Sequence, residues 1–408
     1  MARHYSVRDF FRQMPNAMLA RYFERRGLFG ELDFTAMKET RTDALFVAWL
    51  ALPADVRKVM EAEFREIQDM SNENGSLTIV QEARWQMRDR PPEALEVLVD
   101  LLAGLPSHFE RAMVTFLDYR DCWWGATLFH HADRLPYWRK RKNVPRCAAA
   151  VDDASIEQLA ALIRNHFHET EGRGRNCLVD ALRRDDRDYF FAYPEDYAQG
   201  NNEWVGDELK ARPHNPAFEV VFVYSQRDGT LDVNCKGTDK KVTHALQSMF
   251  AKAILKLGVL PREDKDEQVY DLDRLARRGF AFAYPIDSGI DRVAVKRLRL
   301  SSCIKDGDRI TLEADPTDDP DAIYALVEQV ARGVPLNHYN VTQVDLEVRV
   351  VVDPAKPAKT VTIRITYPNS CTLKSDGVDA KLRAMLEASG VEPKAPATLP
   401  GAAVALVA

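Results

Sequence analysis

Histidine and acidic residues occur together in two short segments of the chain, and side chains of these types can bind a metal ion. A metal site requires neutral imidazoles and carboxylates that reach within about 2 Å of one ion. The residues that could form such a site are His130, His131, Asp133, His168 and Glu169. Their spacing matches neither HExxH nor another established ligand pattern. A metal-dependent hydrolase is therefore an alternative hypothesis, and the sequence identifies neither the metal nor any other cofactor.

A run of basic and aromatic residues at positions 137 to 146 suggests a different activity. It contains five positive charges and no negative charge. Basic side chains can neutralise phosphates while aromatic rings stack on bases. The residues predicted to bind nucleic acid are Trp138, Arg139, Lys140, Arg141, Lys142 and Arg146. The alternative interpretation is a solvated charged run at a domain junction. A second basic group, at positions 292 to 299, could extend the same surface.

Other motifs give little support for catalysis. The turn at Glu171 to Asn176 contains glycine and arginine and could approach a phosphate, but it does not match GxxxxGK[ST]. A loop between helices is the simpler interpretation. The sequence contains no GxSxG motif for a serine nucleophile. The six cysteines form no CxxC pair, which argues against a zinc ribbon and against a disulfide-rich secreted scaffold.

The composition is that of an ordinary folded protein. Of the 408 residues, 46% are hydrophobic and 29% are charged, and a chain of this length is expected to form two or three domains. The net charge of −6 excludes a globally basic protein but allows a local basic surface. No stretch approaches the roughly 20 apolar residues of a membrane helix, and no secretory signal is evident. We therefore expect a soluble, cytoplasmic protein.

The N-terminal third has the apolar spacing of helices. Its hydrophobic residues recur at steps of three and four, which places them on one side of a helix. One such stripe comprises Val56, Val59, Met60, Phe64 and Ile67. Glycine and proline breaks divide the region into several helices. These features predict a helical domain over residues 1–150.

The hydrophobic period then changes towards two, which is typical of strands. Asn143 to Asp153 is the expected linker, and Ser155 with Gln158 is expected to cap the next helix. The expected hairpins pair 218–224 with 230–236, and 292–300 with 309–314. Further helices are expected at 238–258, 319–333 and 379–388. The predicted fold class is α+β, with a helical N-terminal domain followed by a larger domain of antiparallel sheet with packed helices.

The clearest alternation lies near the end of the chain. Val344 to Val352 and Val361 to Tyr367 alternate apolar and polar residues, so we expect them to pair as antiparallel neighbours with one face in water. The larger domain is therefore expected to cover 151–392. The tail at 393–408 is rich in alanine and proline and is expected to be disordered.

One short sequence occurs twice. Tyr189 to Asp196 and Phe280 to Asp287 share Phe-Ala-Tyr-Pro-x-Asp, and each follows an arginine-rich segment that is expected to be helical. A duplicated strand and loop is one explanation. Chance is the other, because residues before proline favour extended geometry in any chain.

These observations favour a non-enzymatic binding or regulatory component of a cytosolic system. Such a component would contact nucleic acid or a partner protein through the basic and aromatic segment. The metal-dependent hydrolase remains the first alternative, and a structural subunit of a larger assembly is the second. The sequence gives no substrate and no oligomeric state.

Overall fold

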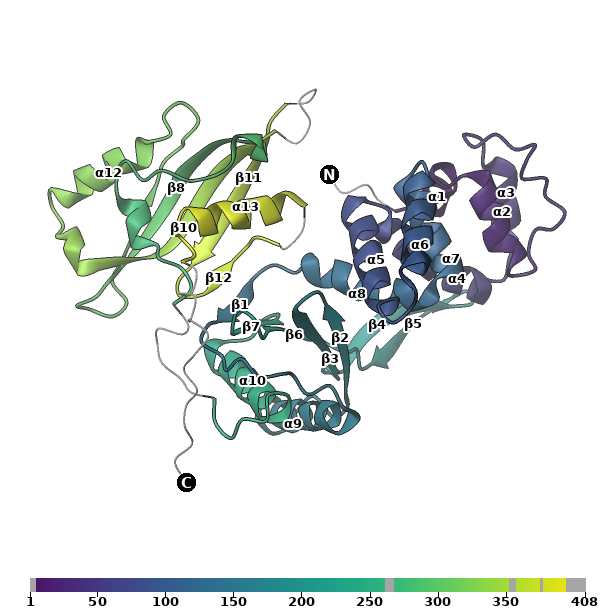
Figure 1. Ribbon diagram of the computed structural model, residues 1–408, viewed down its shortest axis with the longest axis horizontal. Helices are drawn as coiled ribbons and strands as arrows, with labels where there is room; N and C mark the ends of the chain where they lie inside the picture. Colours follow the sequence, from purple (N-terminus) through teal and green to yellow (C-terminus); the bar gives the residue numbers. More distant parts are fainter. Residues whose placement is uncertain (1–4, 261–267, 352–356, 375–376, 394–408) are drawn as a thin grey trace. The chain divides into compact units, whose positions relative to one another are not determined.

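The computed structural model describes residues 5–260, 268–351, 357–374 and 377–393. The chain forms two compact units, Met1–Arg134 and Leu135–Ala408, and Figure 1 labels the elements of both. We expected the division near residue 150. It occurs earlier because residues 138–141 form a strand of the second unit's sheet.

The first unit is built from helices. Those described are α1 (Val7–Gln13), α2 (Asn16–Glu24), α3 (Asp43–Leu50), α4 (Ala54–Met70), α5 (Glu73–Gln86), α6 (Pro92–Gly104), α7 (His108–Asp118) and α8 (Arg120–Asp133). Aromatic rings form the centre of the core. The ring centroid of Phe64 lies 4.5 to 5.7 Å from those of Phe10, Phe11, Tyr22 and Trp49.

The predicted apolar stripe at 56–67 lies on α4. Met60, Phe64 and Ile67 are buried, whereas Val59 is 61% exposed. Val59 precedes Met60 by one residue, which turns its side chain by about 100° around the helix and away from the core. None of the helices in the described ranges has the length and apolar content needed to cross a bilayer.

The second unit contains a long antiparallel sheet. Its order is β2-β3-β6-β7-β1-β12-β11-β10-β8-β9. The strands are β1 (Trp138–Arg141), β2 (Cys177–Arg184), β3 (Arg187–Pro194), β6 (Val220–Ser225), β7 (Thr230–Cys235), β8 (Ile290–Ser302), β9 (Arg309–Glu313), β10 (Tyr339–Val350), β11 (Lys359–Thr366) and β12 (Ser370–Cys371). A separate ribbon is formed by β4 (Gln199–Val205) and β5 (Glu208–His214).

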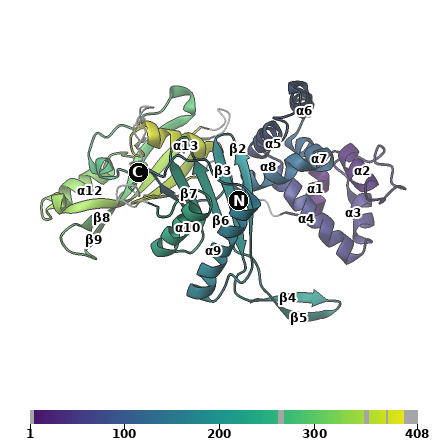
Figure 2. The ribbon, with the colours of Figure 1, turned by 60° about the horizontal axis from the view of Figure 1, so that its bottom comes forward.

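Helices pack against this sheet and form two cores. The helices are α9 (Asp153–Glu171), α10 (Lys240–Ala253), α12 (Ala322–Ala331) and α13 (Gly377–Ala388), with short 3-10 turns η1 (Asp273–Ala276), η2 (Ile286–Ser288) and η3 (Leu336–His338). Side chains of α9 and α10 share a core with β3, β6 and β7. Those of α12 and α13 share a second core with β8, β10 and β11. Figure 2 shows α9 and α10 running along the sheet.

The α+β fold class and its main strand pairs are confirmed. The two predicted hairpins form as β6 with β7 and β8 with β9. The alternating segments near the C-terminus form β10 and β11, with Val348 opposite Val361. The helix expected at 238–258 forms as α10, with Asp239 as its N-cap, but it ends at Ala253, before Gly258. The predicted tail lies outside the described residues from residue 394 onwards.

Four local predictions are wrong. The turn at Glu171 to Asn176, interpreted as a loop between helices, leads from α9 into β2. The carboxylate of Asp152, rather than Ser155, caps α9 by accepting a hydrogen bond from the Ser155 amide at 3.0 Å. The segment 182–187, expected to be helical, ends β2 and begins β3, because the two strands pair along their full length. The second copy of Phe-Ala-Tyr-Pro is not a strand: residues 280–285 are irregular and lead into η2. The two copies therefore do not form a repeated structural unit.

Candidate nucleic-acid interface

The candidate metal ligands are divided between the two units. His130, His131 and Asp133 lie on α8 of the first unit, and His168 and Glu169 lie on α9 of the second. Among the residues that the structure describes, no three His, Cys, Asp or Glu side chains form a group that could hold a metal ion.

The imidazole of His130 is built into the helical unit. It is 4% exposed, and its Nδ1 lies 3.0 Å from the amide nitrogen of Asn74 on α5. Burial, together with the nearby charge of Arg134, lowers the pKa of His130 to about 4. At neutral pH this side chain is therefore an uncharged hydrogen-bonding group between α5 and α8.

The predicted nucleic-acid-binding segment contributes to the interior of the sheet. Its residues Trp138 to Arg141 form β1, which pairs with β7 on one side and β12 on the other. Trp138 is 8% exposed and Arg141 only 3%. The Trp138 indole donates a hydrogen bond to the Leu135 carbonyl at 2.8 Å. Arg139 is partly buried, and burial lowers its pKa.

The two lysines of the segment contact the C-terminal part of the chain. Lys140 Nζ lies 2.5 Å from Glu392 Oε1, and the Glu392 side chain is 7% exposed. Lys142 Nζ donates to the carbonyls of Val269 and Pro393, at 3.3 and 2.8 Å. Burial alone would lower the pKa of Lys140, but the charges of Asp232 and Glu392 raise it. These lysines hold distant parts of the unit together.

Arg146 is the member of the predicted set that remains open to solvent. It follows β1 in the chain. Its guanidinium forms no hydrogen bond or ion pair with another described residue. With Arg183 and Arg227 it lines a shallow cavity of about 310 Å³. Asp186 also lines this cavity and lies 3.0 Å from Arg227, and Arg183 contacts Asp188 at 3.4 Å, so two of the three arginines have acidic partners.

A larger group of charged residues, ranging from buried to exposed, lies on the face of β8, β9, β10 and β11 opposite the apolar core, which we call the polar face. Strand register places alternate residues of these strands on this side, opposite the apolar core. Its seven basic residues are Arg292, Lys296, Arg297, Arg299, Arg309, Arg349 and Arg364. Its four acidic residues are Asp291, Glu313, Asp345 and Glu347. The polar face is therefore locally basic in a protein of negative net charge.

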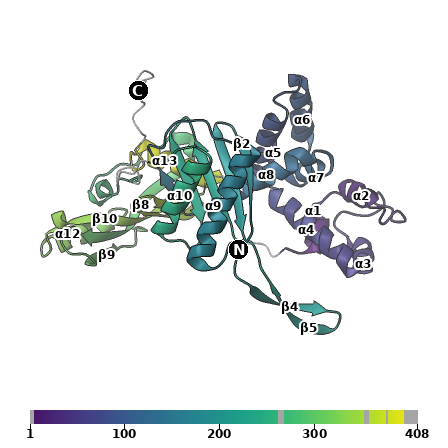
Figure 3. The ribbon, with the colours of Figure 1, turned by 90° about the horizontal axis from the view of Figure 1, so that it is seen from below.

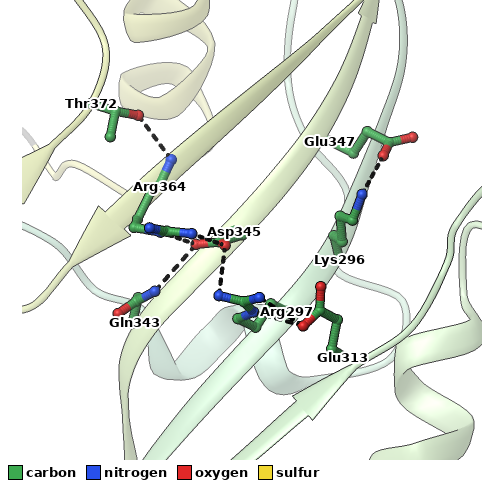
Figure 4. Close-up of polar contacts among 8 residues, drawn as sticks. All are labelled: Lys296, Arg297, Glu313, Gln343, Asp345, Glu347, Arg364 and Thr372. Carbon is green, nitrogen blue, oxygen red and sulfur yellow. Dashed lines mark hydrogen bonds and ion pairs between the residues drawn. The ribbon is translucent and has the colours of Figure 1, made fainter.

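Asp345 lies between Arg364, Arg297 and Gln343 on the polar face, as Figure 4 shows. Arg364 donates to both of its oxygens at 2.8 and 2.7 Å, Arg297 approaches to 3.5 Å, and Gln343 donates at 3.4 Å. Asp345 is only 4% exposed. Burial alone would raise the pKa of Asp345, but its bonds to Arg364 and the nearby charges lower it. Asp345 is therefore a fixed negative charge that orients its arginine neighbours.

Further ion pairs form on the polar face, but two of its arginines take no part in them. Arg297 also contacts Glu313 at 2.7 Å, and Lys296 contacts Glu347 at 3.2 Å. Arg299 and Arg309 form no ion pair with another described residue. Burial first, and then repulsion by Arg309 and Arg364, lowers the pKa of Arg299. Arg299 therefore lies between two arginines that repel it, and an anion beside Arg299 would relieve that repulsion.

An exposed aromatic residue lies near Arg364, at the β11 end of the polar face. Tyr137 is 54% exposed and has a left-handed backbone, with φ of 63°. Its amide donates to the Cys371 carbonyl at 3.1 Å, which attaches it to the end of β12. The pKa of Arg364 is raised chiefly by Asp345 and also by Tyr137. A flat ring next to clustered guanidinium groups is the combination that binds bases and phosphates of a single strand.

Sequence reasoning identified part of this surface. Arg292 to Arg299 was noted as a basic group, but Arg309 and Arg364 were not connected with it. The alternation of β11 could have shown this, because Arg364 lies between the apolar residues Ile363 and Ile365. What the sequence could not supply was the strand order, which places β9 and β11 on either side of β8 and β10.

Comparisons with known proteins do not assign a class to the chain: no protein-family model matches the sequence, and no characterised protein matches it significantly.

Proposed function

We propose that the protein is a non-enzymatic binding component that contacts the phosphates of a single-stranded nucleic acid through the polar face. The observation that carries this proposal is the cluster of Arg299, Arg309 and Arg364, in which two arginines have no acidic partner among the described residues. Like charges gathered on a solvated sheet destabilise one another. Phosphates would neutralise them, and counterions would be released into solution on binding.

The shape of the surface favours a single strand over a duplex. An antiparallel sheet with an exposed aromatic ring can receive unstacked bases while basic side chains follow the backbone. Tyr137 supplies such a ring beside Arg364. A reducing cytoplasm is the compartment we propose, because the six cysteines are free thiols.

The decisive variant is Arg299→Gln combined with Arg309→Gln. Binding of labelled single-stranded DNA and RNA is followed by fluorescence anisotropy between about 50 and 200 mM salt, the range in which phosphate contacts weaken strongly. Each phosphate contact removed lowers the slope of log K against log salt by roughly 0.7 for a single strand, so we expect a decrease of about 1.4. Duplex DNA is measured in parallel and should bind more weakly.

The matched control is Arg175→Gln combined with Arg332→Gln. These arginines are exposed and lie in the same unit, outside the polar face, and the double variant removes the same number of charges. The control should retain the salt slope of the parent protein. Absence of binding by the parent at the low-salt limit, or an equal loss in both double variants, would refute the proposal. Binding to an acidic peptide but to no oligonucleotide would identify a protein ligand instead.

A further inference from the structure

The ribbon of β4 and β5 is a second surface without an assigned role. All residues of both strands are exposed, and the pairing runs from Gln199 opposite His214 to Val205 opposite Glu208. A two-residue turn, Gly206-Asp207, closes it, with φ of 65° at Gly206. Figure 3 shows the ribbon extending from the sheet of its unit. A two-stranded hairpin by itself is at best marginally stable in water.

The two faces of the ribbon differ in polarity. Because side chains alternate between faces, the register assigns each cross-strand pair to one side. The polar side has the pairs Gln199–His214, Asn201–Arg212, Glu203–Lys210 and Val205–Glu208. The other side, which we call the apolar side, has the pairs Gly200–Pro213, Asn202–Ala211 and Trp204–Leu209. The apolar side contains no charged residue, yet Trp204 is 71% exposed and Leu209 is 54% exposed.

The base of the ribbon is held firmly. Asp196 accepts a hydrogen bond from Arg173 at 2.9 Å, and its carbonyl accepts one from Asn215 at 3.2 Å. The Tyr197 hydroxyl donates to the Glu171 carbonyl at 2.6 Å. The strands are therefore fixed where they leave the unit, while Trp204 and Leu209 lie near the far end. A fixed base with an uncovered apolar side is the arrangement expected of an arm that packs against a partner.

We propose that the apolar side of the ribbon packs face to face against the same side of a second copy of this chain. A twofold axis parallel to both layers and perpendicular to the strands would place the tip of one ribbon over the base of the other. Trp204 would then lie over Gly200 of the second copy, and Leu209 over Pro213. Space is available at Gly200, because a Cβ atom built there meets nothing within 4 Å.

The distribution of charge on the ribbon favours a second copy of the chain over nucleic acid or an anionic lipid surface as its partner. Two apolar sides meet without bringing any charges together, and all the charged pairs remain on the outer, polar sides. The tip has three acidic residues, Glu203, Asp207 and Glu208, and one basic residue, Lys210, which contacts Glu208 at 2.7 Å. Its net charge is therefore negative, which disfavours nucleic acid and anionic lipid surfaces. On the apolar side, the large residues Trp204 and Leu209 lie near the tip and the small residues Gly200 and Pro213 lie near the base. This arrangement makes the surface complementary to itself, as a twofold contact requires.

The area predicts a weak association. A ribbon of this length covers about 23 Å along the strands, from a rise of roughly 3.3 Å per residue. Its width of two strands limits the total area buried by both copies to less than about 1,000 Å², which is small for a stable complex. The dimer should therefore form at high micromolar concentration and dissociate on dilution.

Sedimentation velocity of the full chain from about 5 to 500 μM tests the proposal. Weak, reversible dimerisation is expected, and Trp204→Glu should raise the dissociation constant at least about tenfold, because it places two charges in the apolar contact. The matched control is Asn201→Glu, which adds the same charge to the polar side of the same strand and should leave the dissociation constant unchanged. A parent protein that stays monomeric at the highest concentration would overturn the proposal, as would equal effects of the two variants.

Cross-linking gives a second, geometric test. The proposed axis passes near Ala211, so Ala211→Cys should be joined to its own counterpart by a thiol-specific linker of about 8 to 10 Å, matching the spacing of packed sheets. Asn201→Cys, on the polar side, should not be joined. Both variants carry Cys303→Ser, which removes the exposed native thiol. Joining through Asn201→Cys but not Ala211→Cys would show that the opposite side forms the contact.

The ribbon could instead bind a lipid surface. Binding of Trp204 to neutral lipid vesicles without dimerisation would refute a second copy of the chain as the partner of the apolar side.

Discussion

Two regions of the second unit contain similar basic side chains and use them in opposite ways. In β1 and the residue after it, Lys140 contacts Glu392 and Lys142 contacts backbone carbonyls, so both lysines act within the protein. On the polar face, Arg299 and Arg309 form no ion pair with another described residue, and Arg299 donates a hydrogen bond only to the Thr342 hydroxyl, at 3.4 Å. The sequence predicts the first region as the nucleic-acid site, whereas we propose the second.

The difference comes from which faces of the strand are covered and not from composition. Trp138 and Arg141 point to opposite faces of β1 and are both buried, so β1 is covered at both faces of the sheet. β8 to β11 have a core on one face only. Local charge density predicts a basic surface only where the strand has a solvent face. Ion pairing with acids far away in sequence, such as Glu392, decides which basic residues stay available.

The largest effect is expected for Lys140→Met. It leaves the carboxylate of Glu392 without its partner in a site that is nearly closed to water, so unfolding of the second unit should become easier by about 3 kcal/mol. Urea denaturation followed by tryptophan fluorescence measures this change. Lys140→Met combined with Glu392→Gln should recover much of the loss. A single variant as stable as the parent would mean that Lys140 is free to contact a ligand.

A smaller effect is expected for Asp345→Asn. Arg364 would lose a bidentate charged partner, and stability at neutral pH should fall by about 2 kcal/mol. The pKa of Asp345 is lowered in the folded protein, so its stabilising contribution is present at neutral pH and is lost as the pH falls below about 4. The parent should therefore lose more stability than the variant between pH 5 and pH 2.

Nucleic-acid binding is a second measurement that distinguishes β1 from the polar face. Asp345→Asn makes the polar face more basic, so affinity for single-stranded DNA should increase while stability decreases. Lys140→Met should change stability without altering the salt dependence of binding. If Lys140→Met lowered the salt slope and Asp345→Asn left affinity unchanged, β1 and not the polar face would be the nucleic-acid surface.

The sequence predicted the parts of the fold whose signal is local. Val344 to Val350 alternates strictly, and its pairing with β11 follows from that alternation. β4 and β5 were missed because their apolar residues, such as Trp204 and Leu209, are too few to form an alternating run. The Gly206-Asp207 turn was the available signal for that ribbon. The capping residue of α9 was misplaced because Asp152 and Ser155 are both good caps and lie in one turn.

The candidate site could not be predicted from the sequence, because it depends on the order of the strands in the sheet. Arg299, Arg309 and Arg364 are separated by up to 65 residues in sequence and lie on one face because β9, β8, β10 and β11 lie in that order. Tyr137 reaches the same cluster through β12, which pairs with β1. Strand order is determined by pairing between distant segments, so a single sequence shows the basic residues without showing which of them meet.

The smallest effect on stability is expected for Arg299→Gln. Arg299 has no ion pair among the described residues and is repelled by Arg309 and Arg364, so its removal should shift stability by less than about 0.5 kcal/mol. A slight gain is the expected direction, because one repulsive charge disappears. Arg297→Gln is the matched control, since it is the adjacent basic position on the same face of β8 and contacts both Glu313 and Asp345. That control should lose about 1 kcal/mol. Thermal and urea unfolding of the two variants measure the difference. Equal destabilisation would mean that Arg299 holds the sheet together, as Lys140 does elsewhere, and that its charge is not reserved for a ligand.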